Sequence, residues 1–192
     1  MDKSWIILTD AQFAGYFDGL AAAKIGFNGS TETKTLLGWV ASQLRPGKVN
    51  KLYIMAHGIS LTTAGAAQGM SLEGDYSLPE KTSGFGIMLG DTPIAVDNDH
   101  LFQALRGKGL KYIVLASCGI ANGNNQGNWG DGRSLCQHIA SYTGATVFAS
   151  DVTQYAGADW TGNLYQFKPN QSTGGQLLSR PYPQVATRVD YE

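Results

Sequence analysis

Two short apolar runs, each ending in a reactive side chain followed by glycine, constrain this chain more than any other feature. The first covers 52–58 (Leu-Tyr-Ile-Met-Ala-His-Gly) and the second covers 113–119 (Ile-Val-Leu-Ala-Ser-Cys-Gly). Continuous apolar runs of this length are typical of strands buried on both faces of a parallel sheet. Functional groups in such sheets gather just past the carboxyl ends of the strands. If the two strands are neighbours, His57 and Cys118 are presented side by side.

Length and charge narrow the classes of protein to consider. A chain of 192 residues is most simply a single domain, 1–192, with a core that needs no disulfides or metals. The net charge is −1 and there is no basic run, so we expect no nucleic-acid partner and no anionic-membrane partner.

The longest N-terminal apolar run, Trp5 to Leu8, is too short for a signal peptide or a membrane span. We therefore expect a soluble protein without membrane insertion, either cytoplasmic or exported as part of a larger secreted protein. The two cysteines are compatible with a disulfide but do not identify the compartment. The oligomeric state stays open.

The remaining pattern predicts alternating strands and helices around the two runs. The segment 11–25 suits either a loose helix or an ordered loop, because glycines weaken its helical spacing. The first expected elements are a buried strand at 4–9 that ends at Asp10, and a helix at 31–44 with Ser30 as N-cap. A loop and hairpin insertion follows at 59–96, with Asp91 at its turn, and then a helix from Asp97 or Asp99 to about 107. The last expected elements are a helix at 131–142 followed by Gly144, a strand at 145–150, and a C-terminal extension at 152–192 in short strands or an extended tail on the sheet edge. This order predicts an α/β fold with a mostly parallel central sheet.

An imidazole beside a thiol is the arrangement of a cysteine nucleophile with a histidine base. Glycine after each residue lets a substrate carbonyl approach the backbone closely. The backbone N–H groups of Gly58 and Cys118 then suit an oxyanion hole. The alternative is structural, because cysteine is among the most often buried residue types and a lone cysteine closing a strand usually packs in the core.

Taken together, these motifs resemble the caspase–gingipain–clostripain superfamily of cysteine peptidases (clan CD). The similarity covers roughly 48–152 and is closest to caspase-like domains of large bacterial surface proteins and to self-processing peptidase domains of bacterial toxins. The resemblance implies a three-layer sandwich with helices on both faces of the sheet. It also implies His57 as general base and acid, Cys118 as nucleophile, and the Gly58 amide in the oxyanion hole.

Peptidases of this superfamily select the P1 residue of the substrate through a pocket at the strand ends. Asp10 and Asp151 each close a predicted strand, and either would favour a basic P1 residue by charge pairing. The alternatives are a helix N-cap for Asp10 and a turn residue for Asp151. Ser117, just before the nucleophile, and Trp129, in the following Gly/Asn-rich loop, are further candidates for contact with substrate.

Departures from the family pattern are also present. The acidic residue that some members place just before the cysteine is missing, and the lysines and arginines do not cluster as an inositol phosphate activator would require. A zinc site from His57, Cys118 and His138 matches no compact ligand spacing. We therefore expect no metal and no cofactor, a surface role for His138 and a small buried role for Cys136.

The sequence thus predicts a cysteine endopeptidase that acts on protein or peptide substrates, with a basic P1 residue and self-processing as further hypotheses. Two alternatives stay open. One is a catalytically inactive caspase-like module that binds protein or has a structural role in a bacterial assembly. The other is a cysteine hydrolase that acts on a non-peptide amide.

Overall fold

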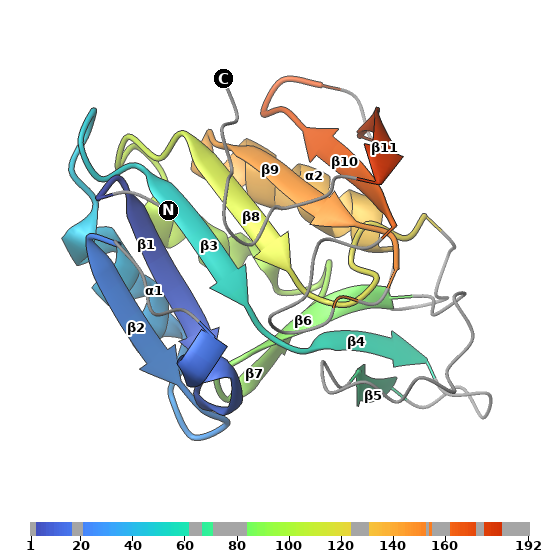
Figure 1. Cartoon of the computed structure of the whole chain (residues 1–192), viewed down its shortest axis with the longest axis horizontal. Helices are drawn as coiled ribbons and strands as arrows, with labels where there is room; N and C mark the ends of the chain where they lie inside the picture. The colour runs from blue at the N-terminus through green and yellow to red at the C-terminus, as the bar shows by residue number, and fades with distance from the viewer. Residues whose placement is uncertain are drawn as a thin grey trace.

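The computed structural model has an α/β fold built on a seven-stranded sheet of order β11-β10-β9-β8-β3-β1-β2 (Figure 1). It describes residues 3–16, 21–61, 67–70, 84–123, 131–152, 154, 162–171 and 175–181. The strands from β9 to β2 in this order run parallel, and β10 and β11 extend the sheet antiparallel at one edge. The bounds are β1 Trp5–Asp10, β2 Ala23–Phe27, β3 Lys51–Met55, β8 Tyr112–Ala116, β9 Thr146–Ser150, β10 Asn163–Phe167 and β11 Gln176–Pro181.

The direction in which each connection crosses the sheet determines which face its helix covers. The chain moves from β2 to β3, β8 and β9 in one direction, and α1 (Thr33–Gln43), the 3-10 helix η2 (Asp99–Leu105) and α2 (Gly132–Thr143) follow in those connections. From β1 to β2 it moves in the opposite direction through the 3-10 helix η1 (Ala11–Tyr16). Because parallel crossovers are almost always right-handed, η1 belongs on the face opposite to the other helices. Figure 1 shows this arrangement.

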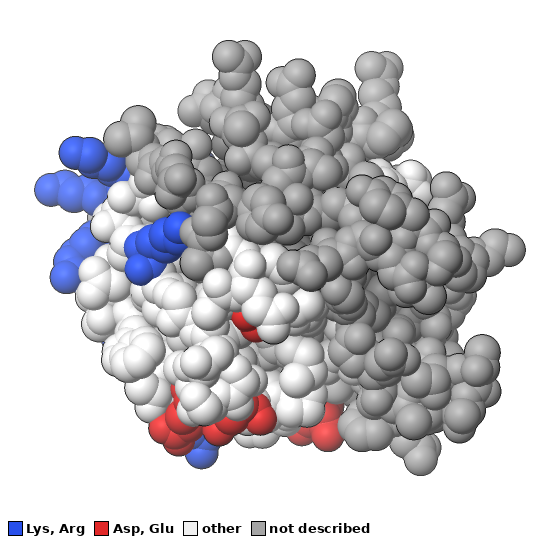
Figure 2. Space-filling model, turned by 60° about the horizontal axis from the view of Figure 1, so that its bottom comes forward, with Lys and Arg blue, Asp and Glu red and all other residues white. Residues whose placement is uncertain are grey.

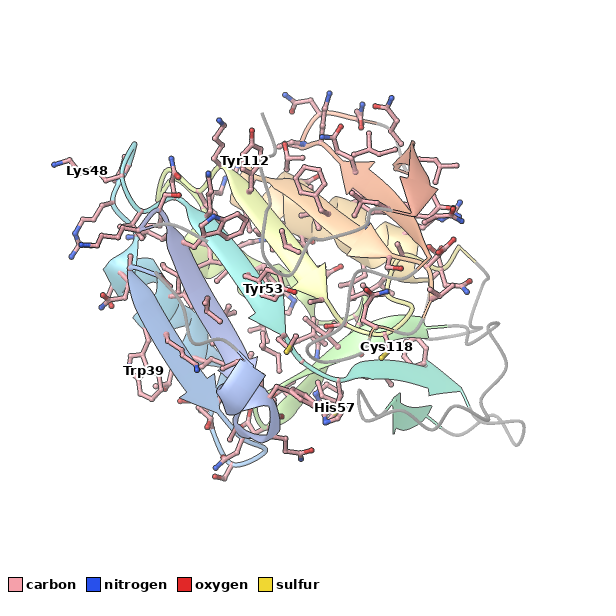
Figure 3. The ribbon with its side chains drawn as sticks, in the orientation of Figure 1. Trp39, Lys48, Tyr53, His57, Tyr112 and Cys118 are labelled. Carbon is pink, nitrogen blue, oxygen red and sulfur yellow. The ribbon has the colours of Figure 1, made fainter. Side chains whose placement is uncertain are left out.

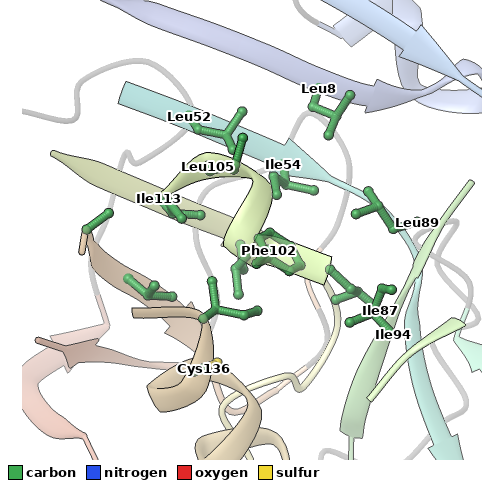
Figure 4. Close-up of a cluster of buried hydrophobic side chains, with 14 of the residues drawn as sticks. Leu8, Leu52, Ile54, Ile87, Leu89, Ile94, Phe102, Leu105, Ile113 and Cys136 are labelled. Carbon is green, nitrogen blue, oxygen red and sulfur yellow. The ribbon is translucent and has the colours of Figure 1, made fainter. Parts of the chain in front are cut away.

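The two faces of the sheet have separate apolar cores. On one, the helical face, α1, η2 and α2 bury Leu36, Phe102 and Leu135 against strand residues such as Ile54. Figure 4 shows Phe102 of η2 among strand side chains that include Ile54 and Ile113. On the other, the second face, lie the buried residues Trp5, Phe13, Tyr53, Met55, Val114, Ala116, Cys118, Phe148 and Leu164. We expected helices on both faces, but within the described ranges the only helical residue in the second-face cluster is Phe13 of η1.

Two local predictions for the N-terminal part need correction. The segment 11–25 is neither one helix nor one loop, because it contains η1 and most of the edge strand β2. Ser30 is not the N-cap of α1, which begins at Thr33 after Glu32. The Ser30 N–H and hydroxyl both donate to the side-chain oxygen of Asn28 in a turn, at 3.0 and 2.7 Å.

The cap predictions for the two later helices had different outcomes. η2 is a 3-10 helix whose N-cap is Asn98, so neither Asp97 nor Asp99 caps it. At α2, the Asp131 carboxylate accepts from the Ser134 N–H at 2.8 Å, and Gly144 ends the helix with a φ of 76°. A left-handed φ of this kind favours glycine, which confirms the predicted C-terminal position of Gly144.

A smaller antiparallel sheet, β5-β4-β6-β7, lies beyond the carboxyl end of β3 (Figure 1). Its strands are β4 Gly58–Leu61, β5 Ala67–Met70, β6 Gly84–Leu89 and β7 Thr92–Ile94. β6 and β7 form the expected hairpin, with Gly90 and Asp91 in its two-residue turn. The Asp91 carboxylate accepts from the Thr33 N–H at 3.1 Å and thus attaches the hairpin to the first turn of α1. β4 begins directly after His57, so this sheet fixes the backbone at the candidate site.

Candidate functional site

The predicted dyad lies beside the point where the strand order changes direction. β1 is flanked by β2 on one side and β3 on the other, and the connections that leave β1 and β3 diverge. In parallel α/β sheets, ligands bind outside the carboxyl ends of the strands at such a point. Gln12 follows β1, His57 follows β3 and Cys118 follows β8. Figure 3 shows His57 and Cys118 at this edge.

The strand register brings the His57-Gly58 and Cys118-Gly119 motifs together. β3 and β8 are parallel neighbours with Met55 opposite Ala116, so His57 and Cys118 follow at the same level. A Cβ atom built on Gly58 would lie 3.0 Å from both the carbonyl carbon and the nitrogen of Cys118, and closer still to its carbonyl oxygen. The two motifs therefore touch through their backbones, and no side chain fits at position 58 without a shift.

His57 and Cys118 also share one face of the sheet. Along β3 and β8, Tyr53, Met55 and Ala116 contribute to the second-face cluster, which includes Cys118. The half-buried His57 ring meets the ring of Phe13, from the same cluster, edge to face at a centroid distance of 4.9 Å. The predicted nucleophile and base are thus on the same side at adjacent strand ends.

His57 is held from two directions. Its carbonyl oxygen accepts from the Met88 N–H of β6 at 2.8 Å. Its Nε2 atom lies 3.4 Å from Oε1 of Gln12 in η1. The Gln12 N–H donates to Asp10 Oδ1 at 3.0 Å, which fixes the start of η1. Sequence reasoning missed Gln12, and the only local signal was an aspartate two residues earlier that can form a side-chain turn.

Cys118 is buried under the chain that follows β9. Its sulfur donates to the carbonyl oxygen of Gln154 at 3.5 Å, and the Gly119 N–H donates to the carbonyl of Val152 at 2.8 Å. Gly119 has a φ of 62°, which favours glycine in this turn. The sulfur is therefore covered, and the turn that carries it is hydrogen-bonded to the covering segment.

Two opposing effects act on the thiol. Burial raises the pKa of Cys118 from 9.0 to about 11, while backbone hydrogen bonds of Gln154, Gly58 and Cys118 act to lower it. At neutral pH this arrangement therefore holds a neutral thiol.

The predicted acidic residues Asp10 and Asp151 do not point to the His57–Cys118 pair. Asp10 is opposite Phe27 in the β1–β2 pairing, and Phe27 belongs to the helical face. The Asp151 carboxylate accepts from the backbone N–H and side-chain amide of Asn163, at 3.0 and 2.9 Å. Asp10 thus binds the start of η1, and Asp151 connects the end of β9 to β10.

The remaining candidates have separate positions. Ser117 is buried, alternation after Leu115 directs it to the helical face, and its hydroxyl has no hydrogen-bond partner among the described residues. Trp129 is outside the described residues. His138 lies on α2, where its Nδ1 is 2.6 Å from the buried carboxylate of Asp99 in η2. Cys136 packs in the helical-face core, and it forms no disulfide with Cys118.

No metal centre or membrane-spanning element emerges from the part of the chain that the structure describes. Histidine, cysteine and acidic side chains do not form groups of three or more there that could hold a metal ion. None of its helices has both the length and the apolar character needed to cross a membrane.

Charged side chains do not concentrate at the centre of the described surface near the carboxyl edge. With that edge of Figure 1 turned forward, acidic side chains gather at the lower rim and basic ones at one side, with a mostly uncharged surface between them (Figure 2).

Comparisons of the chain with family models, with curated proteins and with solved structures find no match.

Proposed function

We propose that this protein is a caspase-like cysteine endopeptidase with His57 as base and Cys118 as nucleophile. The observation that carries the proposal is the backbone contact between Gly58 and Cys118, which joins two motifs sixty residues apart at neighbouring strand ends. A purely structural cysteine does not require a histidine-glycine pair at the adjoining strand end. The same contact adds support, because it brings the backbones of Gly58 and Cys118 together, as an oxyanion hole built from their N–H groups requires.

In the proposed reaction, His57 removes the thiol proton and the Cys118 sulfur attacks the carbonyl carbon of the scissile peptide bond. The carbonyl oxygen becomes an oxyanion, which the Gly58 and Cys118 N–H groups stabilise. His57 then gives its proton to the leaving nitrogen as the C–N bond breaks, which leaves a thioester. Water hydrolyses the thioester with His57 as base and regenerates the thiol.

The proposal requires the described arrangement to be a resting form. A thiol with a pKa of about 11 and a sulfur under the Gln154 carbonyl reacts slowly at pH 7. Movement of Gln154 away from the sulfur would admit water and substrate. It would also remove the desolvation that dominates the pKa shift. Activity would then depend on the population of the open form.

The basic P1 preference does not form part of the proposal. Asp10 lies on the opposite face from Cys118, and both carboxylate oxygens of Asp151 accept hydrogen bonds from Asn163 at the start of β10. Two described side chains that contact His57, those of Gln12 and Phe13, are uncharged. A peptide library with every class of P1 residue is therefore the appropriate substrate set.

A second candidate is a catalytically inactive module with the same fold. The buried sulfur and the raised pKa of Cys118 favour it directly, because a nucleophile must be reached by its substrate. In this case Cys118 packs in the second-face core and the Gly58 contact serves only to close the two sheets against each other.

Alkylation of the folded protein separates the two candidates. The protein is treated with iodoacetamide at pH 7 to 8 and peptide mapping measures modification of Cys118, with buried Cys136 as an internal reference. The variants are His57→Ala and, as matched control, His100→Ala on the surface of η2. The peptidase predicts that Cys118 reacts faster than Cys136, that His57→Ala slows only Cys118, and that a peptide in the library is cleaved. Equal, slow labelling of both cysteines without cleavage would indicate the inactive module.

A further inference from the structure

η1 places an amide side chain against the imidazole of His57. Gln12 Oε1 lies 3.4 Å from His57 Nε2, and the neighbouring Phe13 ring packs edge to face on the imidazole. The contact joins the ends of β1 and β3, which are adjacent parallel strands. Two consecutive residues of η1 thus contact the proposed base, one through a polar atom and one through a ring.

The backbone that carries Gln12 is itself fixed. Its N–H donates to Asp10 Oδ1 at 3.0 Å, at the last residue of β1. Phe13 is fully buried in the second-face cluster, so η1 cannot slide along the sheet without exposing an aromatic ring. The amide of Gln12 therefore projects from a held segment, although the side chain itself is exposed.

We propose that Gln12 is a positioning residue that selects the tautomer of His57, an inference that rests on the proposed function. A neutral imidazole has one N–H and one lone pair. An amide oxygen accepts only from an N–H, so the contact with Oε1 places the proton on Nε2. Nδ1 then holds the lone pair and is the nitrogen that serves as base toward the Cys118 thiol.

The same contact assists the imidazolium that forms after proton transfer. A hydrogen bond from a charged donor is shorter and stronger than one from a neutral donor, so the interaction with Gln12 strengthens when His57 becomes charged. The titratable groups at the described strand ends on either side of His57 are Asp10 of β1 and Cys118 of β8. Asp10 acts on this site through the backbone of Gln12, and Cys118 is the proton donor.

NMR of the full chain tests the proposal without any need for catalysis. The ¹⁵N shifts of the His57 ring report its tautomer, with His57→Gln to assign the signals. The variants are Gln12→Ala, Gln12→Glu and, as control, Gln103→Ala on the exposed surface of η2. The rate of iodoacetamide labelling of Cys118 is measured on the same samples.

Native protein should show the Nε2–H tautomer, and Gln12→Ala should show a mixture of both. Gln12→Glu should retain the Nε2–H form, because a carboxylate oxygen also accepts only from an N–H. Labelling of Cys118 should slow about threefold to tenfold in Gln12→Ala, as expected from the loss of one hydrogen bond, and recover in Gln12→Glu. Gln103→Ala should match the native protein in each measurement.

An Nδ1–H tautomer in native protein, or an unchanged His57 tautomer in Gln12→Ala, would overturn the proposal. The failure of the peptidase itself has a different signature. In that case the tautomer follows Gln12 as predicted, but Cys118 remains unreactive in every variant and no peptide is cleaved.

Discussion

The contact between Gly58 and the backbone of Cys118 leads to a sharp prediction for Gly58→Ala. The new Cβ would be 3.0 Å from the carbonyl carbon and nitrogen of Cys118 and closer still to its carbonyl oxygen. Because the obstacle is backbone, no rotamer change relieves the clash, and β4 must move away from the end of β8. Overpacking of this kind typically costs about 1–3 kcal/mol in the free energy of unfolding. For a protein of this size, 2 kcal/mol corresponds to a fall of about 4–8 °C in Tm.

Gly38→Ala is the matched control, because it adds the same methyl group at a site with nothing within 4 Å. Gly38 is exposed in the interior of α1, where alanine should stabilise the helix by about 0.5–1 kcal/mol relative to glycine. Urea denaturation followed by circular dichroism gives both free energies of unfolding. The two substitutions should therefore change stability in opposite directions.

A double variant identifies the atoms responsible. If the clash is with the Cys118 backbone, the cost of Gly58→Ala should persist in a Cys118→Ala background to within about 0.5 kcal/mol. Loss of the cost in that background would assign it to the sulfur instead. If Gly58→Ala is as stable as the native protein, the two motifs do not touch as described, and the main support for the dyad is lost.

Other predictions follow from the charges and buried thiols of the fold. The pKa of Cys118 in the folded protein is raised from 9.0 to about 11, so the thiol's contribution to the free energy of unfolding should be complete below pH 9 and disappear as the pH rises toward 11. Urea titrations over this range should show a smaller loss of unfolding free energy in Cys118→Ala than in the native protein. An identical loss would contradict the raised pKa. The pKa of Asp91 is lowered, mainly by the hydrogen bond from the Thr92 hydroxyl, so Asp91 should stabilise the native state above pH 3.8 and cease to do so in more acidic solution. The free energy of unfolding of Asp91→Asn should therefore depend less on pH in this acidic range. In the native protein His138 Nδ1 lies 2.6 Å from the buried Asp99 carboxylate, and His138→Ala removes this interaction. The substitution should destabilise the protein by about 1–3 kcal/mol. An unchanged unfolding midpoint would show that the pair does not join η2 to α2.

Local sequence determined the features that depend on short-range pattern. The apolar runs before His57 and Cys118 are β3 and β8, the hairpin turns at Asp91, and Gly144 ends α2. Each signal lies within a few residues, as a buried run, a turn residue or a glycine with positive φ. The pairing of β3 with β8 was only a condition at the level of sequence, and the structure shows that the two strands are parallel neighbours.

Only the tertiary structure decided which side chains share a face and what surrounds them. Asp10 ends its strand as predicted, but alternation directs it away from Cys118, while Gln12 two residues later reaches His57. The cover that Gln154 provides over the sulfur comes from a segment 36 residues further along the chain. A shift of one residue in register would exchange the two faces of a strand, and neither register nor long-range contact is encoded within a short stretch of sequence.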